Sequence, residues 1–238
     1  MLIGICGLIG AGKDTIAGHL VENFGYERYS WATPLKDMTA ILFCWDRDML
    51  EGTTPEQRAE REVLDAWWSA KLGRDWSPRT ALQYMGTEVM REALHSDIWV
   101  LAGMHRIAGK KNVVISDMRF PNEVKAVREM GGKIWNVRRG PNPEWFDKLT
   151  VFKQSGDIKD DLVEWFMKEN FPNVHASEYS WHGTAFDAVF YNDSTIDRLK
   201  HSVDSVIRDQ VWLLYLRQVV KLSYTVKTKS SQILTIYI

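Results

Sequence analysis

The sequence predicts an α/β fold in which a parallel β-sheet lies between two layers of helices. An unbroken apolar run over residues 2–6 leads through a glycine-rich turn into a segment with apolar residues at helical spacing. A second unalternating run, over residues 112–116, is rich in β-branched side chains, as expected for a strand covered on both faces. Strand and helix patterns alternate along much of the 238 residues, which is typical of parallel sheets.

The N-terminal part of the chain is predicted to hold two strand–helix units. After the first strand, the spacing of Ile16, Leu20 and Phe24 predicts a helix. A short strand is expected over residues 26–31, and Pro34 is placed to open a second helix. The apolar positions expected to face the core from that helix are Leu35, Met38, Ile41 and Leu42.

A charged segment then leads into a region where helices dominate. Thr54 and Gln57 have the spacing of a capping box, with a proline at the first helical position. A serine and a proline at residues 77–78 give the same start signal for a helix that runs to about residue 94, and another helix is expected over residues 97–108. We therefore expect a helical region over about residues 46–108.

Strands and helices alternate again in the second half of the chain. A helix over residues 122–130, strands over 133–137 and 187–191, and a helix capped by Ser194 are expected. Residues 138–183 are irregular and rich in proline, tryptophan and charge, with one helical stretch at 161–168, and we interpret them as a mobile lid.

The expected organisation is one domain over residues 1–208 followed by an extension over residues 209–238. The extension leans toward β structure but carries no recognisable chemistry, so an edge element, a dimer contact and an appended tail all stay open. A homodimer is one of the possible assemblies.

Charge and composition exclude several classes of function. The 30 Lys and Arg residues are balanced by 31 Asp and Glu residues, so no net positive field is available for stable binding of nucleic acid. The two cysteines, Cys6 and Cys44, form neither a disulfide framework nor a metal-binding spacing, which favours a reducing, cytoplasmic setting. The N-terminal apolar run is too short to span a membrane, so no membrane partner is expected.

Residues 7–15, Gly-Leu-Ile-Gly-Ala-Gly-Lys-Asp-Thr, have the G-x-x-x-x-G-K spacing of a phosphate-binding loop (P-loop) between a strand and a helix. Main-chain amides of such a loop and the helix N-terminus point at a polyphosphate, while Lys13 adds a positive charge. The alternative is a glycine-rich turn without a catalytic role. The nucleotide-binding residues predicted from this motif are Gly7, Gly10, Ala11, Gly12, Lys13, Asp14 and Thr15.

One position of this motif departs from the usual pattern. Asp14 stands where a Ser or Thr hydroxyl normally binds Mg²⁺, and the hydroxyl of Thr15 comes one residue later. A carboxylate is also a good ligand for this hard cation. We expect Asp14, Thr15 and Asp117 to support Mg²⁺.

Asp117 and Arg119 follow the strongest strand, at the edge where open α/β sheets bind their ligands. Such an acidic residue can hold the water shell of Mg²⁺, and the arginine can bind a phosphate with two hydrogen bonds. The alternative is a surface pair that caps the next helix. Arg138 and Arg139, which begin the lid, are further candidates to neutralise the transferred group, although a single arginine is more often a solvated surface residue. None of the six histidines has the spacing of metal ligands, and we assign none to catalysis.

Several separated segments resemble the deoxynucleoside monophosphate kinases of tailed bacteriophages, which have the P-loop nucleoside monophosphate kinase fold. The segments are Gly12-Lys13-Asp14-Thr15, residues 31–36 (WATPLK), 79–88 (RTALQYMGTE), 99–100 (WV), 116–123 (SDMRFPNE), 175–178 (HASE) and 187–193 (DAVFYND). The resemblance spans roughly residues 1–205 and implies a three-layer P-loop NTPase fold with a helical acceptor-binding insertion and a lid.

The resemblance also implies roles for individual residues. ATP would lie on residues 7–15, Asp117 and Arg119 would lie between donor and acceptor, and residues 138–180 would be the closing lid. The substrate-binding residues it implies are Trp31, Lys36, Arg79, Gln83, Arg91 and Glu178.

The function expected on these grounds is transfer of the γ-phosphoryl group of ATP to a deoxynucleoside 5′-monophosphate, with Mg²⁺. Lys13, Asp117, Arg119, Arg138 and Arg139 are the expected catalytic residues. Two alternatives stay open: another small-molecule P-loop kinase, acting on dephospho-coenzyme A or phosphomevalonate, and a nucleotide-hydrolysing switch or ATPase. A phage-encoded enzyme of this kind would act in the host cytoplasm.

Overall fold

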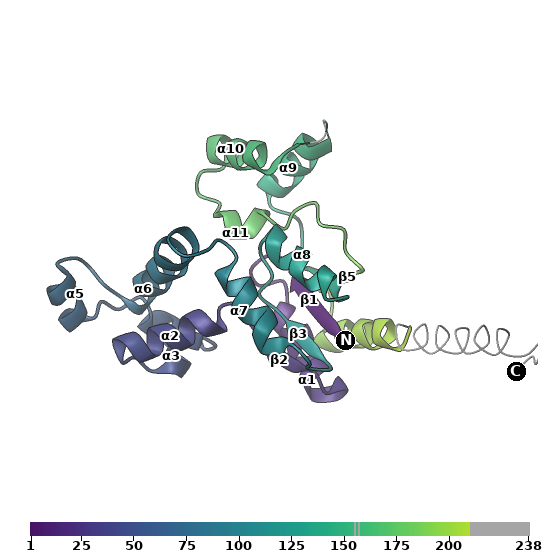
Figure 1. Cartoon of the computed structure of the whole chain (residues 1–238). Helices are drawn as coiled ribbons and strands as arrows, with labels where there is room; N and C mark the ends of the chain where they lie inside the picture. Colours follow the sequence, from purple (N-terminus) through teal and green to yellow (C-terminus); the bar gives the residue numbers. More distant parts are fainter. Residues whose placement is uncertain (155, 157, 210–238) are drawn as a thin grey trace, which may run out of the picture.

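A computed structural model describes residues 1–154, 156 and 158–209 of the chain. Within these described residues, five strands form one sheet in the order β2-β3-β1-β4-β5, and every neighbouring pair is parallel (Figure 1). The strands are β1 (Leu2–Cys6), β2 (Glu27–Tyr29), β3 (Val113–Ile115), β4 (Lys133–Arg138) and β5 (Ala188–Tyr191). The predicted α/β class with a parallel sheet is confirmed.

The strand order fixes where a ligand can bind. β1 is central, and the chain places β3 on one side of it and β4 on the other. At such a switch point the loops that leave neighbouring strands diverge and open a crevice at the carboxyl ends of the strands. The glycine-rich loop after β1 lies at this crevice.

Helices cover both faces of the sheet, so the fold has the three layers expected. On one face, α1 (Lys13–Phe24) and the helical residues 196–209 pack on β1 through an apolar cluster that includes Ile3, Leu20 and Leu199. On the other face, α7 (Ile98–Ile107) and α8 (Pro121–Glu129) pack on the sheet through a second cluster. Thr195, not the predicted Ser194, caps the last helix by accepting from the N–H of Arg198 (3.3 Å).

A group of helices extends to one side of the sheet (Figure 1). Its members are α2 (Thr33–Phe43), α3 (Arg47–Glu51), α4 (Pro55–Glu60), α5 (Ala66–Leu72), α6 (Pro78–Tyr84) and η1 (Met85–Glu92). The capping box that opens α4 is present as predicted. The helix expected from residue 78 onward changes to π-helical winding over η1. Ile41 and Leu42 were expected in the core but are exposed, because α2 buries Thr39 and Phe43 instead.

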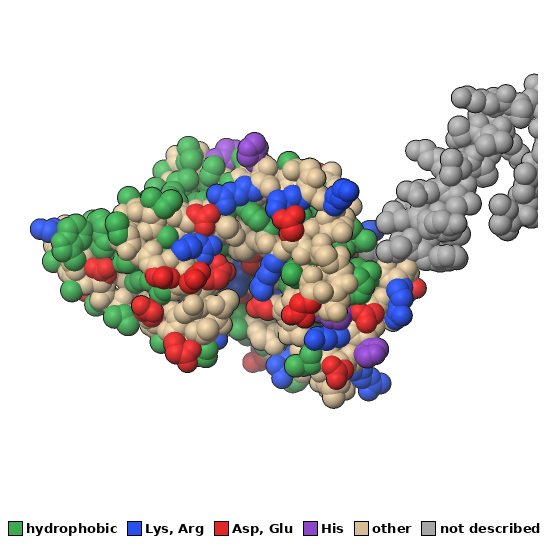
Figure 2. All heavy atoms as spheres, turned by 90° about the horizontal axis from the view of Figure 1, so that it is seen from below, with side chains coloured by type: hydrophobic (Ala, Val, Ile, Leu, Met, Phe, Trp, Pro, Cys, Tyr) green, Lys and Arg blue, Asp and Glu red, His purple; other side chains and the backbone are tan. Residues whose placement is uncertain are grey.

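The outer end of this helical region carries several exposed apolar side chains. Val63, Leu64, Trp67 and Leu72 lie in or beside α5 and are exposed. Figure 2 shows hydrophobic side chains gathered at that end, while basic and acidic side chains are interspersed over the rest of the face in view.

Residues 138–183 are more regular than predicted. They form α9 (Glu144–Gln154), α10 (Asp160–Asn170) and α11 (Ala176–Tyr179), of which only α10 was expected. Trp145, Phe146 and Leu149 are buried on one side of α9, at helical spacing. The two prolines just before α9, at residues 141 and 143, made the segment look irregular.

Two further findings concern membrane-spanning helices and the C-terminal extension. None of the described helices is long and apolar enough to cross a bilayer. The C-terminal extension was predicted over residues 209–238, and all of it except residue 209 lies outside the described residues.

Candidate active site

The glycine-rich loop between β1 and α1 packs closely on the ends of β4 and β5. Gly7 and Gly12 have positive φ angles of 152° and 108°. A Cβ atom on Gly7 would lie 2.5 Å from the carbonyl oxygen of Val137, and one on Gly12 would lie 2.6 Å from Nδ2 of Asn192. A side chain at either position would push the loop away from the sheet, so only glycine permits this path.

Lys13 is the first residue of α1, and its side chain lies back over the loop. Its Nζ donates to the carbonyl oxygens of Gly7 (2.8 Å) and Leu8 (2.9 Å). Burial lowers the pKa of Lys13 and the positive charge of Arg119 lowers it further, whereas the negative charges of Asp14 and Glu178 raise it. Two residues that are distant in sequence, Arg119 and Glu178, therefore lie near the loop lysine.

Asp14 lies in the first turn of α1 and is held by two residues from neighbouring strands. Its Oδ1 forms an ion pair with Arg28 of β2 and accepts from the hydroxyl of Ser116, at the end of β3 (3.2 Å). Arg28 also donates to that hydroxyl (2.9 Å). Sequence reasoning missed Arg28 and Ser116, because neither belongs to the loop motif. The carboxylate of Asp14 and the hydroxyl of Ser116 therefore lie together beside the guanidinium group of Arg28, at the N-terminus of α1.

Asp117 stabilises the loop that precedes α2 through hydrogen bonds. Its carboxylate accepts from the hydroxyl of Ser30 (2.6 Å) and from the main-chain N–H groups of Trp31 (3.2 Å) and Ala32 (3.4 Å). Both carboxylate oxygens are thus already used. This geometry gives Asp117 a clear role in placing residues 30–32 at the crevice.

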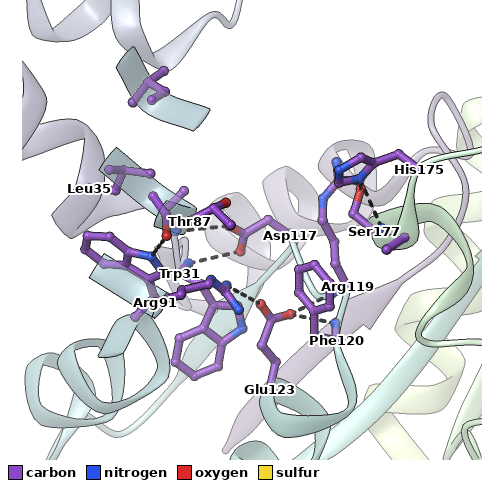
Figure 3. A pocket seen from close by; sticks show the side chains of 15 residues that line it. Trp31, Leu35, Thr87, Arg91, Asp117, Arg119, Phe120, Glu123, His175 and Ser177 are labelled. Carbon is purple, nitrogen blue, oxygen red and sulfur yellow. Dashed lines mark hydrogen bonds and ion pairs between the residues drawn. The ribbon is translucent and has the colours of Figure 1, made fainter. Parts of the chain in front are cut away.

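A pocket of about 460 Å³ opens between the sheet and the helical region (Figure 3). Five separate segments line it: the start of α2, the α6–η1 helix, Trp99 of α7, the start of α8 and the start of α11. The predicted residues among its lining are Trp31, Arg91, Asp117 and Arg119. The sheet edge and the helical region therefore share one pocket, which reaches the neighbourhood of Lys13 through Arg119.

The two arginines of the pocket are held in different ways. Arg119 donates from Nη1 to Ser177 Oγ (3.0 Å) and to Glu178 Oε1 (2.8 Å), so it joins the sheet edge to α11. Arg91 of η1 lies over the ring of Phe120, with 5.0 Å between Cζ and the ring centre. These contacts leave both guanidinium groups at the pocket wall (Figure 3). The pocket is thereby suited to an anionic ligand.

Glu123 is a pocket residue that sequence reasoning missed. Its side chain is buried, and Oε2 accepts from the N–H groups of Arg119 (2.6 Å) and Phe120 (3.1 Å), while Oε1 lies 3.9 Å from Nη2 of Arg91. Burial raises the pKa of Glu123 to about 7, and the negative charge of Asp117 adds to this effect. A glutamate at the third position of a helix that starts with proline is typical of a capping box. This pattern could have indicated from the sequence that Glu123 binds main-chain N–H groups at the start of α8.

Four residues implied by the resemblance do not line this pocket: Lys36, Arg79, Gln83 and Glu178. Lys36 donates to Glu51 Oε1 (2.7 Å), Arg79 is exposed with its Nε 3.9 Å from Glu62 Oε1, and the side chain of Gln83 is exposed. At the other side of the loop, Arg138 donates to Asn136 Oδ1 (2.9 Å), and Arg139 contacts the carbonyl oxygen of Gly10 at 3.5 Å.

Comparison with individual known proteins places this chain in a family, although no family model matches it. It is 33% identical over 155 residues to a protein of Acanthamoeba polyphaga mimivirus assigned as a deoxynucleotide monophosphate kinase, covering 58% of this chain and 74% of that protein. It is 28% identical over 188 residues to the deoxynucleoside-5′-monophosphate kinase of Escherichia phage T5, covering 54% of this chain and 72% of that one.

Solved structures give a looser likeness. A gluconokinase from Sinorhizobium meliloti 1021 aligns over 91% of this chain and 96% of its own at 13% identity, with a TM-score of 0.41. Scores at this level add nothing to the assignment, which stands on the two viral relatives. The resemblance found in the sequence is confirmed, and the chain belongs to the deoxynucleoside monophosphate kinase family of phosphotransferases.

Proposed function

We propose that the protein transfers the γ-phosphoryl group of ATP to a deoxynucleoside 5′-monophosphate and yields the diphosphate. One observation carries the proposal: a pocket with two arginines in its wall lies beside a phosphate-binding loop, and Arg119 connects the two. A donor site alone would serve any nucleotide-hydrolysing protein. The adjacent acceptor-sized pocket favours transfer to a second phosphorylated molecule, as the names of both relatives indicate for those proteins.

Catalysis on this proposal consists of positioning and charge neutralisation, without a covalent intermediate. The amides of residues 7–12 and Nζ of Lys13 hold the donor phosphates. Arg119 lies between loop and pocket and stabilises the negative charge that spreads over the transferred group. Arg91 and Trp31 help to hold the acceptor, with the carboxylate of Glu123 fixing the wall between the two arginines.

The oxygen ligands around α1 suit Mg²⁺, which normally keeps several waters and binds through one or two carboxylates and the substrate phosphates. Asp14 and Thr15 would hold the ion, with Ser116 beside them, and Asp117 would act only through its contact with residues 30–32. The ion would supply neutralisation of phosphate charge. No group of three or more acidic, His or Cys ligands occurs among the described residues, and such a group is not needed for Mg²⁺ bound in this way.

The helices α9 to α11 form the lid of this proposal. Arg138 and Arg139 lie where the chain enters the lid, next to the phosphate-binding loop. Ser177 and Glu178 of α11, where the chain leaves the lid, accept hydrogen bonds from Arg119. Closure over the pocket would exclude water, which would otherwise hydrolyse the donor. We further propose that the enzyme acts in a reducing cytoplasm, a setting in which Cys6 and Cys44 stay free thiols.

The test is ADP formation from ATP and Mg²⁺, measured with and without a panel of deoxynucleoside and ribonucleoside monophosphates, dephospho-coenzyme A and phosphomevalonate. Acceptor-dependent ADP formation with deoxynucleoside monophosphates is the expected result. Activity only with one of the other two acceptors would point to a different small-molecule kinase. Hydrolysis that ignores every acceptor would instead support a nucleotide switch and reject the proposal.

A further inference from the structure

Asn192 connects the phosphate-binding loop to the ends of two strands. It directly follows β5, and its main-chain N–H donates to the carbonyl oxygen of Arg138 at the end of β4 (2.8 Å). Its side-chain Nδ2 donates to the carbonyl oxygen of Ala11 in the loop (3.0 Å). The same nitrogen occupies the space that a Cβ on Gly12 would need, at 2.6 Å. Asn192 is therefore the direct packing partner of the loop's last glycine.

The hydrogen bond from Asn192 controls the orientation of one peptide unit of the loop. In a planar trans peptide the carbonyl group and the following N–H point in opposite directions. With the carbonyl of Ala11 bound to Asn192, the N–H of Gly12 must point away from Asn192. Phosphate-binding loops act through N–H groups that converge on one side, so the orientation of each peptide unit matters for binding.

Neighbouring contacts hold Asn192 itself in place. Asp193 accepts through Oδ1 from the N–H of Gly140 (2.6 Å), which ties the chain after β5 to the chain after β4. Together with the bond to Arg138, this forms a two-point connection at the base of α9. The side-chain amide of Asn192 thus projects onto the loop from a fixed main chain.

We propose that Asn192 is a positioning residue for the ATP phosphates: it fixes the Ala11–Gly12 peptide so that the N–H of Gly12 faces the donor. The inference rests on the proposed function, because it assumes that the loop binds ATP. It assigns to Asn192 an effect on the donor only, since the residue is not part of the acceptor pocket.

Two substitutions test this role. Asn192→Ala removes the donor amide, and Asn192→Asp keeps its shape but presents an oxygen to the Ala11 carbonyl. Both keep the main-chain bond to Arg138. The matched control is Asn170→Ala in α10, whose Nδ2 also donates to a main-chain carbonyl, that of Phe166 (2.8 Å), but away from the loop. Binding of ATP with Mg²⁺ and binding of a deoxynucleoside monophosphate are each measured by calorimetry, and KM and kcat are measured alongside.

The expected result is a roughly tenfold weaker ATP affinity in Asn192→Ala and a larger loss in Asn192→Asp, with acceptor affinity unchanged. The KM for ATP should rise more than kcat falls, and Asn170→Ala should behave as the wild type. Unchanged ATP affinity in both variants would overturn the inference, as would equal losses for donor and acceptor, which would indicate a general structural role. If Asn192→Ala fails to fold, the isosteric Asn192→Asp decides. Failure of the wild-type protein to bind ATP would instead reject the proposed function.

Discussion

The buried carboxyl group of Glu123 should make the stability of the protein depend on pH in a way that one substitution can isolate. Burial raises the pKa of Glu123 to about 7, from an ordinary value of 4.5. Well below pH 4.5 the carboxyl group of Glu123 is protonated in both the folded and the unfolded chain, so it does not lower the free energy of unfolding. Between pH 4.5 and 7 only the unfolded chain releases its proton, so the free energy of unfolding falls as pH rises.

The size of this effect follows from the shift. A difference of about 2.5 pKa units at about 1.36 kcal/mol per unit corresponds to a loss of about 3 kcal/mol between pH 4 and pH 8. Glu123→Gln keeps an acceptor oxygen for the N–H groups of Arg119 and Phe120 but does not titrate in this range. A pH-dependent difference in stability between the two proteins therefore reports on the carboxyl group of Glu123.

The assay is urea denaturation of the wild type and of Glu123→Gln at pH 5 and pH 8. We expect the stability of Glu123→Gln relative to the wild type to increase by about 2–3 kcal/mol from pH 5 to pH 8. The matched control is Glu129→Gln, at the exposed end of α8, which removes a carboxyl group of the same helix that is not buried. The reasoning would be refuted if the difference between the wild type and Glu123→Gln were the same at both pH values.

Three further substitutions probe the loop and the pocket. Lys13→Ala should fold normally yet lower kcat at least about 10²-fold, because it removes the loop cation; wild-type turnover would reject the donor site. Arg119→Ala should lower kcat by a similar factor of about 10² and raise the KM for the acceptor, and unchanged values of both would show that Arg119 does not stabilise the transferred group. Gly7→Ala should destabilise the protein by about 1–3 kcal/mol in thermal unfolding and weaken ATP binding, because its Cβ would meet the Val137 carbonyl at 2.5 Å. Gly18→Ala in α1 is its control, since the backbone there is helical and a Cβ has no neighbour within 4 Å, and an equal loss in both would contradict the explanation.

The donor half of the candidate site was predictable from sequence because it is local. Nine consecutive residues carry the loop, and the strand and helix on either side confirm its setting. The same holds for the capping box of α4 and for strands β1 and β3, whose apolar runs reflect burial on both faces. The contacts of Asn192 and Arg28 with the loop were not predicted, because each joins residues that are distant in sequence. Asn192 is 181 residues from Ala11, and Arg28 is 14 residues from Asp14.

The acceptor half is assembled from five distant segments, and its details depend on packing that no local pattern encodes. Of the residues that the resemblance implied for the substrate, Trp31 and Arg91 line the pocket, whereas the others do not. Lys36 was expected to bind substrate, yet it turns to Glu51 of α3, and Arg79 lies on the outer side near Glu62. A positive charge in the correct segment therefore does not by itself identify a ligand contact, because nearby carboxylates compete for it.

The winding of η1 explains why Arg91 lines the pocket and Gln83 does not. The lining residues of this stretch are Leu82, Gly86, Thr87 and Arg91, which form two pairs separated by five residues. In an α-helix with 3.6 residues per turn, positions five apart lie roughly 140° apart and would face different neighbours. A π-helix closes its turns with i→i+5 bonds, which brings such pairs onto one face, and its last turn here continues into a bond from His95 N–H to the Met90 carbonyl (3.0 Å). Helical periodicity read from the sequence assumes the narrower turn, so it does not indicate which residues of this stretch share the pocket face.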